Sequence, residues 1–152
     1  MNNFQRQGAI SNARVGKEFE LTAQKYFESL GINLQLDFPM ELGFNLKKPH
    51  RFDLGGTVNG ESYLVECKSH TWTNGNNIPS AKMTVWNEVM LYFSLATNNH
   101  KKILFVLRDY SDKRKTTLAS YYVKIYGNLI PTGVTIMEYD SVLNEANVVY
   151  KS

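Results

Sequence analysis

The sequence predicts a single mixed α/β domain in which helices pack on a central sheet. Three observations favour this fold class. The chain has 152 residues, which is a one-domain length. Apolar residues at spacings of three and four, typical of amphipathic helices, alternate along the chain with short apolar runs, typical of strands. Between two of these runs lies the pair Asn59-Gly60, the strongest short signal for a β-hairpin.

The first expected element is a helix. Residues 1–10 are polar, and we expect them to be loosely held. A helical pattern begins at Ser11 or Asn12, either of which is a fair N-cap, and Gly31 is the expected stop. The apolar stripe of this helix consists of Val15, Phe19, Ala23, Tyr26, Phe27 and Leu30.

The later elements alternate between helices and strands. The patterns predict an edge or irregular strand in 32–44, a hairpin over 50–68, a polar loop over 71–80, a helix over 81–97, a strand over 101–109, a charged loop over 110–115, a helix over 116–130 and a last strand over 133–140. The Tyr, Val and Ile content of 116–130 leaves a strand open there. We expect the tail to close with a short helix.

The two strands of the hairpin carry charges within otherwise apolar runs. Counted outward from the turn, Asp53 lies directly opposite Glu66. Arg51 lies opposite Lys68 on the same face. The other face is a core face, formed by Phe52, Leu54, Tyr63, Val65 and Cys67. A one-residue bulge at the Gly-Gly pair after Leu54 would alter this register.

The facing carboxylates indicate a cation site. Two carboxylates held on one face repel each other, and a hard divalent cation relieves the repulsion. Mg²⁺ is typically held by one or two carboxylates together with waters and phosphate oxygens. The adjacent Lys68 is then placed to orient or deprotonate a water, or to stabilise phosphate charge. The alternative is a cross-strand salt-bridge cluster on a solvated sheet face.

At these residues the chain resembles the PD-(D/E)XK nuclease superfamily. The family signature is an Asp on one strand of a hairpin and Glu-x-Lys on the next, here Asp53 and Glu66-Cys67-Lys68. The family often carries G-x-x-F-E on its first helix, and this chain has GKEFE over 16–20. It departs from the family pattern because Phe52, not Pro, precedes Asp53. The resemblance covers residues 12–110, and in compact size it extends to the small Holliday-junction resolvases.

The resemblance implies a restriction-endonuclease-like α-β-β-β-α-β core, a mixed central sheet flanked by helices. It implies a metal site formed by Asp53, Glu66 and the backbone carbonyl of Cys67, with Mg²⁺ as cofactor and Mn²⁺ able to substitute. Lys68 would position the attacking water. Glu20 would hold a second cation, directly or through water. The reaction would be in-line attack on a phosphodiester.

Other residues are candidate nucleic-acid contacts. Around the motif these are Arg51, His70, Trp72 and Lys82; further along the chain they are Lys113, Arg114 and Lys115. For His70, as for His50 at the other end of the hairpin, the alternative is a surface loop residue, and for the basic run the alternative is a solvated loop. Lys101 and Lys102 form a second basic patch. A nucleophilic role for Cys67 is disfavoured because its side chain points to the core face.

Composition narrows the classes of protein further. The net charge of +3 weakly favours an anionic partner. The single cysteine excludes an internal disulfide and favours a cytoplasmic setting, and no run is apolar enough to span a membrane. We expect a metal-dependent endonuclease acting on DNA, and a two-fold homodimer would suit an enzyme of this kind that cuts both strands. The alternative is a non-catalytic nucleic-acid-binding or interaction module that keeps the nuclease fold.

Overall fold

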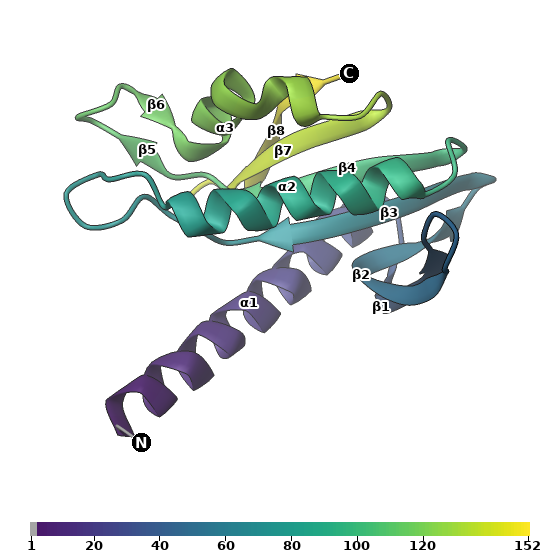
Figure 1. Ribbon diagram of the computed structural model, residues 1–152, viewed down its shortest axis with the longest axis horizontal. Helices are drawn as coiled ribbons and strands as arrows, with labels where there is room; N and C mark the ends of the chain where they lie inside the picture. Colours follow the sequence, from purple (N-terminus) through teal and green to yellow (C-terminus); the bar gives the residue numbers. More distant parts are fainter. Residues whose placement is uncertain (1–2) are drawn as a thin grey trace.

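Six strands form one mixed sheet with helices on both faces (Figure 1). The computed structural model describes the backbone of residues 3–152 and the side chains of residues 12–152. The elements are α1 (Asn3–Ser29), β1 (Gln35–Leu42), β2 (Lys48–Val58), β3 (Glu61–Lys68), α2 (Ser80–Leu95), β4 (His100–Leu107), β5 (Tyr110–Ser111), β6 (Thr116–Thr117), α3 (Leu118–Tyr126), η1 (Gly127–Leu129), β7 (Val134–Asp140) and β8 (Glu145–Lys151).

The strand order of the sheet is β1-β2-β3-β4-β7-β8. The pairs β3–β4 and β4–β7 are parallel, and the remaining pairs are antiparallel. Parallel neighbours need a crossover, which α2 supplies between β3 and β4 and α3 supplies between β4 and β7. The predicted fold class, a mixed sheet flanked by helices, is therefore confirmed. Among residues 3–152, no helix is both long enough and apolar enough to span a membrane.

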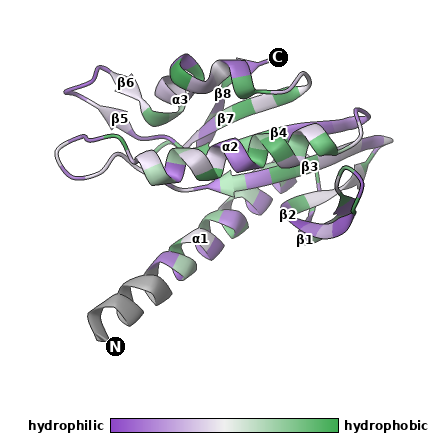
Figure 2. Cartoon of the chain, viewed as in Figure 1, coloured by the Kyte–Doolittle hydropathy of each residue, from purple (hydrophilic) through white to green (hydrophobic). Residues whose placement is uncertain are grey.

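Each face of the sheet buries its own apolar cluster. On one face α1 contributes Phe19, Ala23 and Phe27, which pack on β2, β3 and β4. On the other face α2 and α3 pack on the same strands through Trp86, Phe93 and Tyr122, all fully buried. Figure 2 shows apolar residues along α2 and the strands beside it. Because both faces are covered, a polar residue on a central strand is buried unless it lies at a strand end.

The ends of the chain differ from the sequence prediction. Helix α1 begins at Asn3, before the predicted start at Ser11 or Asn12. The looseness expected of residues 1–10 stays a prediction, because side chains are described only from residue 12. The tail is strand β8, not the predicted short helix. The Asp140 carboxyl accepts the amides of Val142 and Leu143, which builds a tight turn and returns the chain along β7.

Strand β1 lies at the edge of the sheet, as predicted from Pro39. Its ladder with β2 has no pair at Asp37, which adopts a left-handed backbone with φ of 53°. The charged loop predicted over 110–115 instead begins with the short strand β5. This strand pairs with β6, which follows directly after the loop. The helix predicted over 116–130 is present as α3, and Thr117 caps it by accepting the amide of Ser120.

The predicted hairpin is present, but its predicted register holds over only part of its length. Asn59 and Gly60 both have positive φ, as a two-residue turn requires, and the pairing runs as predicted from the turn to Leu54 opposite Val65. There the β2–β3 ladder ends. The predicted pairs of Asp53 with Glu66 and of Arg51 with Lys68 do not form.

The alternation of faces along β2 breaks at Asp53. Leu54 packs in the α1-side cluster together with Val65, whereas Phe52 packs in the α2-side cluster. In a regular strand residues two apart share a face, so Phe52 was wrongly assigned to the face of Leu54. The strand therefore twists at Asp53 and separates from β3. The gap that this leaves beside the end of β3 is where the predicted site residues gather.

Candidate functional site

A pocket of about 780 Å³ opens at the carboxyl ends of the parallel strands β3 and β4. Ligands of α/β sheets commonly bind at this edge, because the loops that leave the strands diverge there. The lining comes from α1, the twist in β2, the end of β3, the loop after it and the start of α2. It includes Gly16, Glu20, Asp53, Cys67, Lys68, His70, Trp72 and Lys82.

Asp53 sits in the gap between β2 and β3. Its Oδ2 accepts a hydrogen bond from the Cys67 amide at 2.7 Å. The N–H and C=O of one strand residue point toward the same neighbouring strand, so the Cys67 carbonyl faces the same gap. Burial, and then the nearby Glu66 carboxylate, raise the pKa of Asp53 to about 7. The Lys68 charge opposes this rise. Asp53 and Glu66 are therefore close enough to repel, although they are not a ladder pair.

Glu66 is buried, with an exposed fraction of 5%. Its Oε1 lies 2.8 Å from Nε2 of His50, and the His50 ring stacks on Tyr92 of α2 at a centroid distance of 3.7 Å. The sequence prediction missed this contact, because in the predicted register His50 lay at the far end of the hairpin. No signal in the sequence places His50 beside Glu66, since the contact depends on the twist of β2.

Glu20 of α1 lies at the rim of the pocket next to Asp53. Burial, and then the Asp53 carboxylate, raise the pKa of Glu20, while Lys17 opposes the rise. Lys17 Nζ contacts Glu20 Oε2 at 3.3 Å and also approaches Asp37 Oδ2 at 3.7 Å. The pairing follows from helix geometry, because residues three apart share a face. The structure therefore brings Glu20 to the predicted site from the opposite layer.

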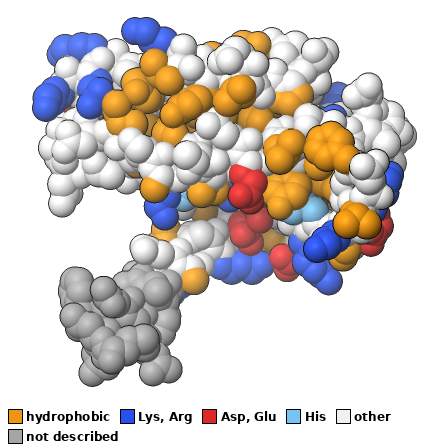
Figure 3. Space-filling view, in the orientation of Figure 1, with side chains coloured by type: hydrophobic (Ala, Val, Ile, Leu, Met, Phe, Trp, Pro, Cys, Tyr) orange, Lys and Arg blue, Asp and Glu red, His pale blue; other side chains and the backbone are white. Residues whose placement is uncertain are grey.

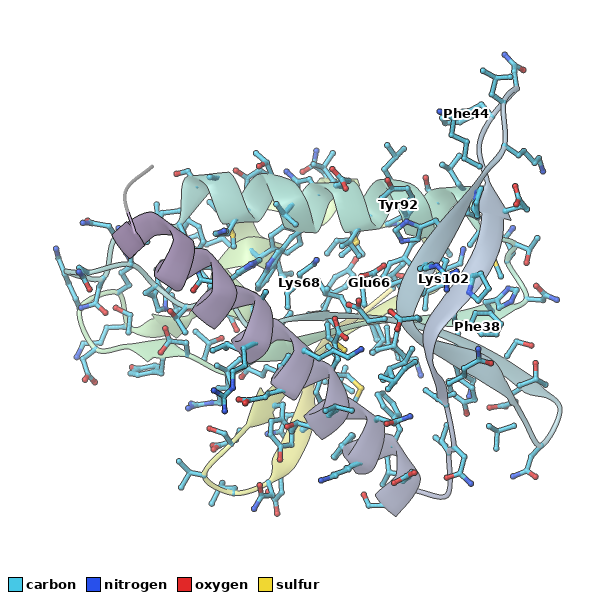
Figure 4. The ribbon with its side chains drawn as sticks, turned by 90° about the horizontal axis from the view of Figure 1, so that it is seen from below. Phe38, Phe44, Glu66, Lys68, Tyr92 and Lys102 are labelled. Carbon is cyan, nitrogen blue, oxygen red and sulfur yellow. The ribbon has the colours of Figure 1, made fainter. Side chains whose placement is uncertain are left out.

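Two cationic side chains and a neutral histidine complete the pocket. Lys68 is half-buried at the last position of β3, and Lys82 is exposed in the first turn of α2. Figure 4 shows Lys68 beside Glu66, in the space between α1 and α2. His70 Nδ1 lies 2.9 Å from the indole nitrogen of Trp86. Burial, and then Lys82 and Lys68, lower the pKa of His70 to about 4.

The Trp86 contact fixes the tautomer of His70. An indole nitrogen only donates, so Nδ1 accepts and the proton of the neutral ring is on Nε2. Because the ring is neutral near pH 7, His70 offers the pocket an uncharged N–H donor. Trp86 itself is fully buried in the α2-side cluster. Its partnership with His70 was not predicted.

Of the predicted nucleic-acid contacts, Trp72 needs correction, and Arg51 lies elsewhere than the predicted register placed it. Trp72 lines the pocket, but its side chain is only 7% exposed and its indole donates to the Asp109 carbonyl at 3.1 Å. Arg114 covers the Trp72 ring at 5.2 Å, so the ring has no free face for a base. Arg51 is exposed and lies opposite Pro39 in the β1–β2 ladder, away from Lys68. Its Nη1 donates to the Asp37 carbonyl at 3.3 Å.

The two predicted basic patches differ in how far their side chains are exposed to solvent. Lys113 and Lys115 are exposed at the β5–β6 turn, where Figure 3 shows Lys and Arg side chains gathered at one end of the molecule. Lys102, by contrast, is buried, and its Nζ donates to the Ala96 carbonyl at the end of α2. Lys101 pairs with Glu61 at 2.6 Å. The Lys101–Lys102 patch therefore does not exist as a binding surface.

The carboxyl groups in and beside the pocket are suitable ligands for a divalent cation, but they do not yet have the spacing of a metal centre. Asp53, Glu66 and Glu20 each give one carboxyl oxygen to a protein donor, and the second oxygen accepts none of the hydrogen bonds found among residues 12–152. Burial, and then a neighbouring carboxylate, raise the pKa of both Asp53 and Glu20, and a bound cation would favour the charged form of each. Across the described residues, no three His, Cys, Asp or Glu side chains already have the spacing of a metal centre.

The fold and pocket together define an α/β protein with an acidic and basic site at the ends of its parallel strands. Comparison with known proteins finds no match for this chain among family models, curated proteins or solved structures. The function therefore has to be inferred from the site itself.

Proposed function

We propose that the chain is a metal-dependent endonuclease that hydrolyses phosphodiester bonds of DNA, with a restriction-endonuclease-like core. One observation carries the proposal. The carboxyls of Asp53 and Glu20 and the amine of Lys68 converge on one pocket, and the Glu66 carboxylate lies beside Asp53. They come from α1, β2 and β3, in the element order α-β-β-β-α-β. Burying two carboxylates that repel each other costs free energy, so their presence in one pocket favours a functional role.

Asp53, Glu66 and the Cys67 carbonyl would hold the cation, Mg²⁺ or Mn²⁺ in its place. When bound, the metal would offset charge on the attacking and leaving oxygens of the phosphodiester. The His50 contact holds the Glu66 carboxyl in one orientation, and the Cys67 amide does the same for Asp53. Glu20, with Lys17 against it, would accept a hydrogen bond from a water in the pocket.

The remaining pocket residues act on the substrate phosphate and the water. Lys68 would orient the attacking water, whose oxygen forms the new bond to phosphorus as the bridging P–O bond breaks. His70 offers its Nε2 proton to a phosphate oxygen without adding charge. Lys82 would contact a neighbouring phosphate from the start of α2. The one cysteine is no nucleophile in this scheme, because burial raises the pKa of the Cys67 thiol.

The alternative function is nucleic-acid binding without catalysis. The observation that favours it is the incomplete assembly of metal ligands among the described residues. It predicts that the protein binds DNA equally well in Mg²⁺ and in EDTA, and that no strand is cut. The buried, charge-crowded Asp53 argues against it, since a binding module keeps no advantage from such a group.

Plasmid nicking tests the proposal. Supercoiled DNA is incubated with the protein in Mg²⁺, in Mn²⁺ and in EDTA, beside labelled duplex, junction, flap, single-stranded and RNA substrates. The variants are Glu66→Gln and, as a matched control, Glu88→Gln, which changes an exposed Glu of α2 outside the pocket. We expect metal-dependent cleavage by the wild type and the control and none by Glu66→Gln. Cleavage that persists in both variants, or in EDTA, would exclude the site.

A further inference from the structure

The connection between β1 and β2 holds two large apolar side chains out in solvent. The exposed fraction of Phe44 is 77% and that of Leu46 is 80%. Figure 4 shows Phe44 at the tip of this connection, clear of the body of the domain. Single exposed apolar residues are common on protein surfaces, but two large ones within three residues at the tip of a projecting hairpin indicate an interaction site.

The tip has a defined conformation. Gly43 has φ of 155°, which favours glycine, and a Cβ at this position would collide with the Leu46 carbonyl. The strands below the tip are paired up to Leu42 opposite Lys48, and the buried Leu42 anchors them in the α2-side cluster. The paired strands and the tight turn therefore hold Phe44 and Leu46 outward, so the backbone conformation of the tip determines their exposure.

The surroundings of the tip are basic. Lys47, Lys48 and Arg51 are exposed on its β2 side, against Glu41 on its β1 side. In Figure 3 hydrophobic and basic atoms lie side by side at the end of the molecule formed by β1 and β2. Proteins that bind the minor groove combine Lys or Arg contacts to phosphates with Phe or Leu wedges that enter between base pairs and kink the duplex. The tip has both components.

The tip and the pocket lie within reach of one duplex. Five residues of β2 separate Lys48 from Asp53, and at the rise of a strand this is about 17 Å. One turn of B-DNA spans about 34 Å, so a duplex cut at the pocket passes the tip about half a turn away.

We propose that the β1–β2 tip is a DNA wedge, in which Phe44 and Leu46 enter a base step while Lys47 and Lys48 bind the flanking phosphates. The proposal rests on the proposed function in taking duplex DNA as the ligand. It sets a substrate class: duplex DNA whose stacking is already interrupted, by a nick, a mismatch or a branch, binds better than continuous duplex, because less unstacking remains to be done.

A second exposed apolar hairpin supplies the matched control. Val142 is 86% exposed and Leu143 is 63% exposed at the β7–β8 turn. Asp140 and Glu145 flank that turn, so its charge is unfavourable for DNA. The test compares three proteins: wild type, Phe44→Ala/Leu46→Ala, and Val142→Ala/Leu143→Ala. Equal thermal melts establish that all three are folded.

Binding is measured in EDTA, so that cleavage plays no part, with nicked and continuous duplexes that carry 2-aminopurine at a central step. We expect the wild type to raise 2-aminopurine fluorescence and to prefer the nicked duplex. The tip variant should bind about tenfold more weakly, with no rise in fluorescence, because an interface anchor is lost. The β7–β8 variant should match the wild type.

Other results separate the wedge from the proposed function. Equal binding and equal fluorescence for the wild type and the tip variant would overturn the wedge, even if Mg²⁺-dependent cleavage is present. Binding and unstacking without cleavage would support the wedge and overturn the nuclease. Tip-dependent binding to phosphatidylglycerol vesicles in place of DNA, or a tip-dependent dimer in sedimentation, would assign the tip to a lipid surface or to a second copy and overturn the wedge.

Discussion

Asp53→Asn separates function from stability at the candidate site. A rise in the pKa of Asp53 from 3.8 to about 7 corresponds to a cost of about 4 kcal/mol when the carboxylate is ionised in the folded state. The neutral amide removes this cost and can still accept the Cys67 amide. Because Glu66 and the backbone relax, we expect about half of this cost to be recovered. The variant should therefore be more stable than the wild type by about 2 kcal/mol at pH 8 in EDTA.

The sign of the pH dependence follows from proton binding. Between the unfolded pKa of 3.8 and the folded pKa of about 7, the folded state holds the Asp53 proton more tightly than the unfolded state. The wild type therefore loses stability as pH rises through this window, and the variant does not. We expect the variant to melt about 4–8 °C above the wild type at pH 8. At pH 5 the gap should shrink to about a third of that.

Thermal melts with EDTA and with Mg²⁺, beside the nicking assay, measure both effects. Mg²⁺ should stabilise the wild type more than the variant, by about 2.7 kcal/mol at a hundredfold excess over its dissociation constant. Cleavage by the variant should be absent, because an amide is a poor ligand for Mg²⁺. The exposed Asp112→Asn serves as control. A variant that melts below the wild type at pH 8 in EDTA, with no differential effect of Mg²⁺, would refute the reasoning and leave Asp53 as a salt-bridge partner of the nearby cations.

Four further predictions concern other positions in the chain. His50→Ala should lower the free energy of unfolding by about 1–3 kcal/mol in urea titrations, because it leaves a buried carboxylate without its partner; an unchanged midpoint would contradict this. Lys68→Met keeps the aliphatic stem and should reduce cleavage by about 10²-fold or more at unchanged melting temperature, whereas the exposed Lys115→Met should leave the rate unaltered. Gly43→Ala should destabilise by more than about 1 kcal/mol, since its Cβ has no space. Gly16→Ala, where a Cβ meets nothing within 4 Å, should stabilise α1 by about 0.5–1 kcal/mol.

The order of elements was predictable because each depends on local patterning. The Asn59-Gly60 turn predicts the hairpin, and local apolar patterns predict α1 and α2, whereas for the segment of α3 the sequence left a strand open beside the helix. These signals need only a few neighbouring residues, which the sequence displays directly. Strand β8 was missed because its turn depends on the Asp140 side chain, which reads as an ordinary acidic residue until the hydrogen bonds are seen.

The composition of the site was predictable, but the way its residues meet was not. A regular hairpin was expected to place Asp53 and Glu66 as a directly facing pair on one face of the sheet. The structure instead buries Glu66, because α2 and α3 cover the face of the sheet on which β3 presents it. Glu66 then needs a partner within the core, and His50 supplies it. Whether a sheet face is covered depends on tertiary packing, and the alternation of one strand does not record it.

The irregularity at Asp53 gives the site its chemistry. In the regular ladder that the sequence predicted, the Cys67 amide and carbonyl would bond to β2 and the Asp53 side chain would stand beside Glu66 on one surface. Because β2 leaves β3 after Leu54, the Cys67 amide bonds to the Asp53 side chain instead, and a gap opens toward α1 and Glu20. The pocket therefore holds the Glu20 carboxyl of α1 and the Asp53 carboxyl of β2, with the Glu66 carboxylate beside Asp53. The left-handed Asp37 on β1 lies opposite this break, and two breaks side by side at an edge indicate that the distortion is specified by the sequence. The charge-crowded pocket exists only while this distortion holds, so at Asp53 the proposed function and the stability of the fold make opposite demands.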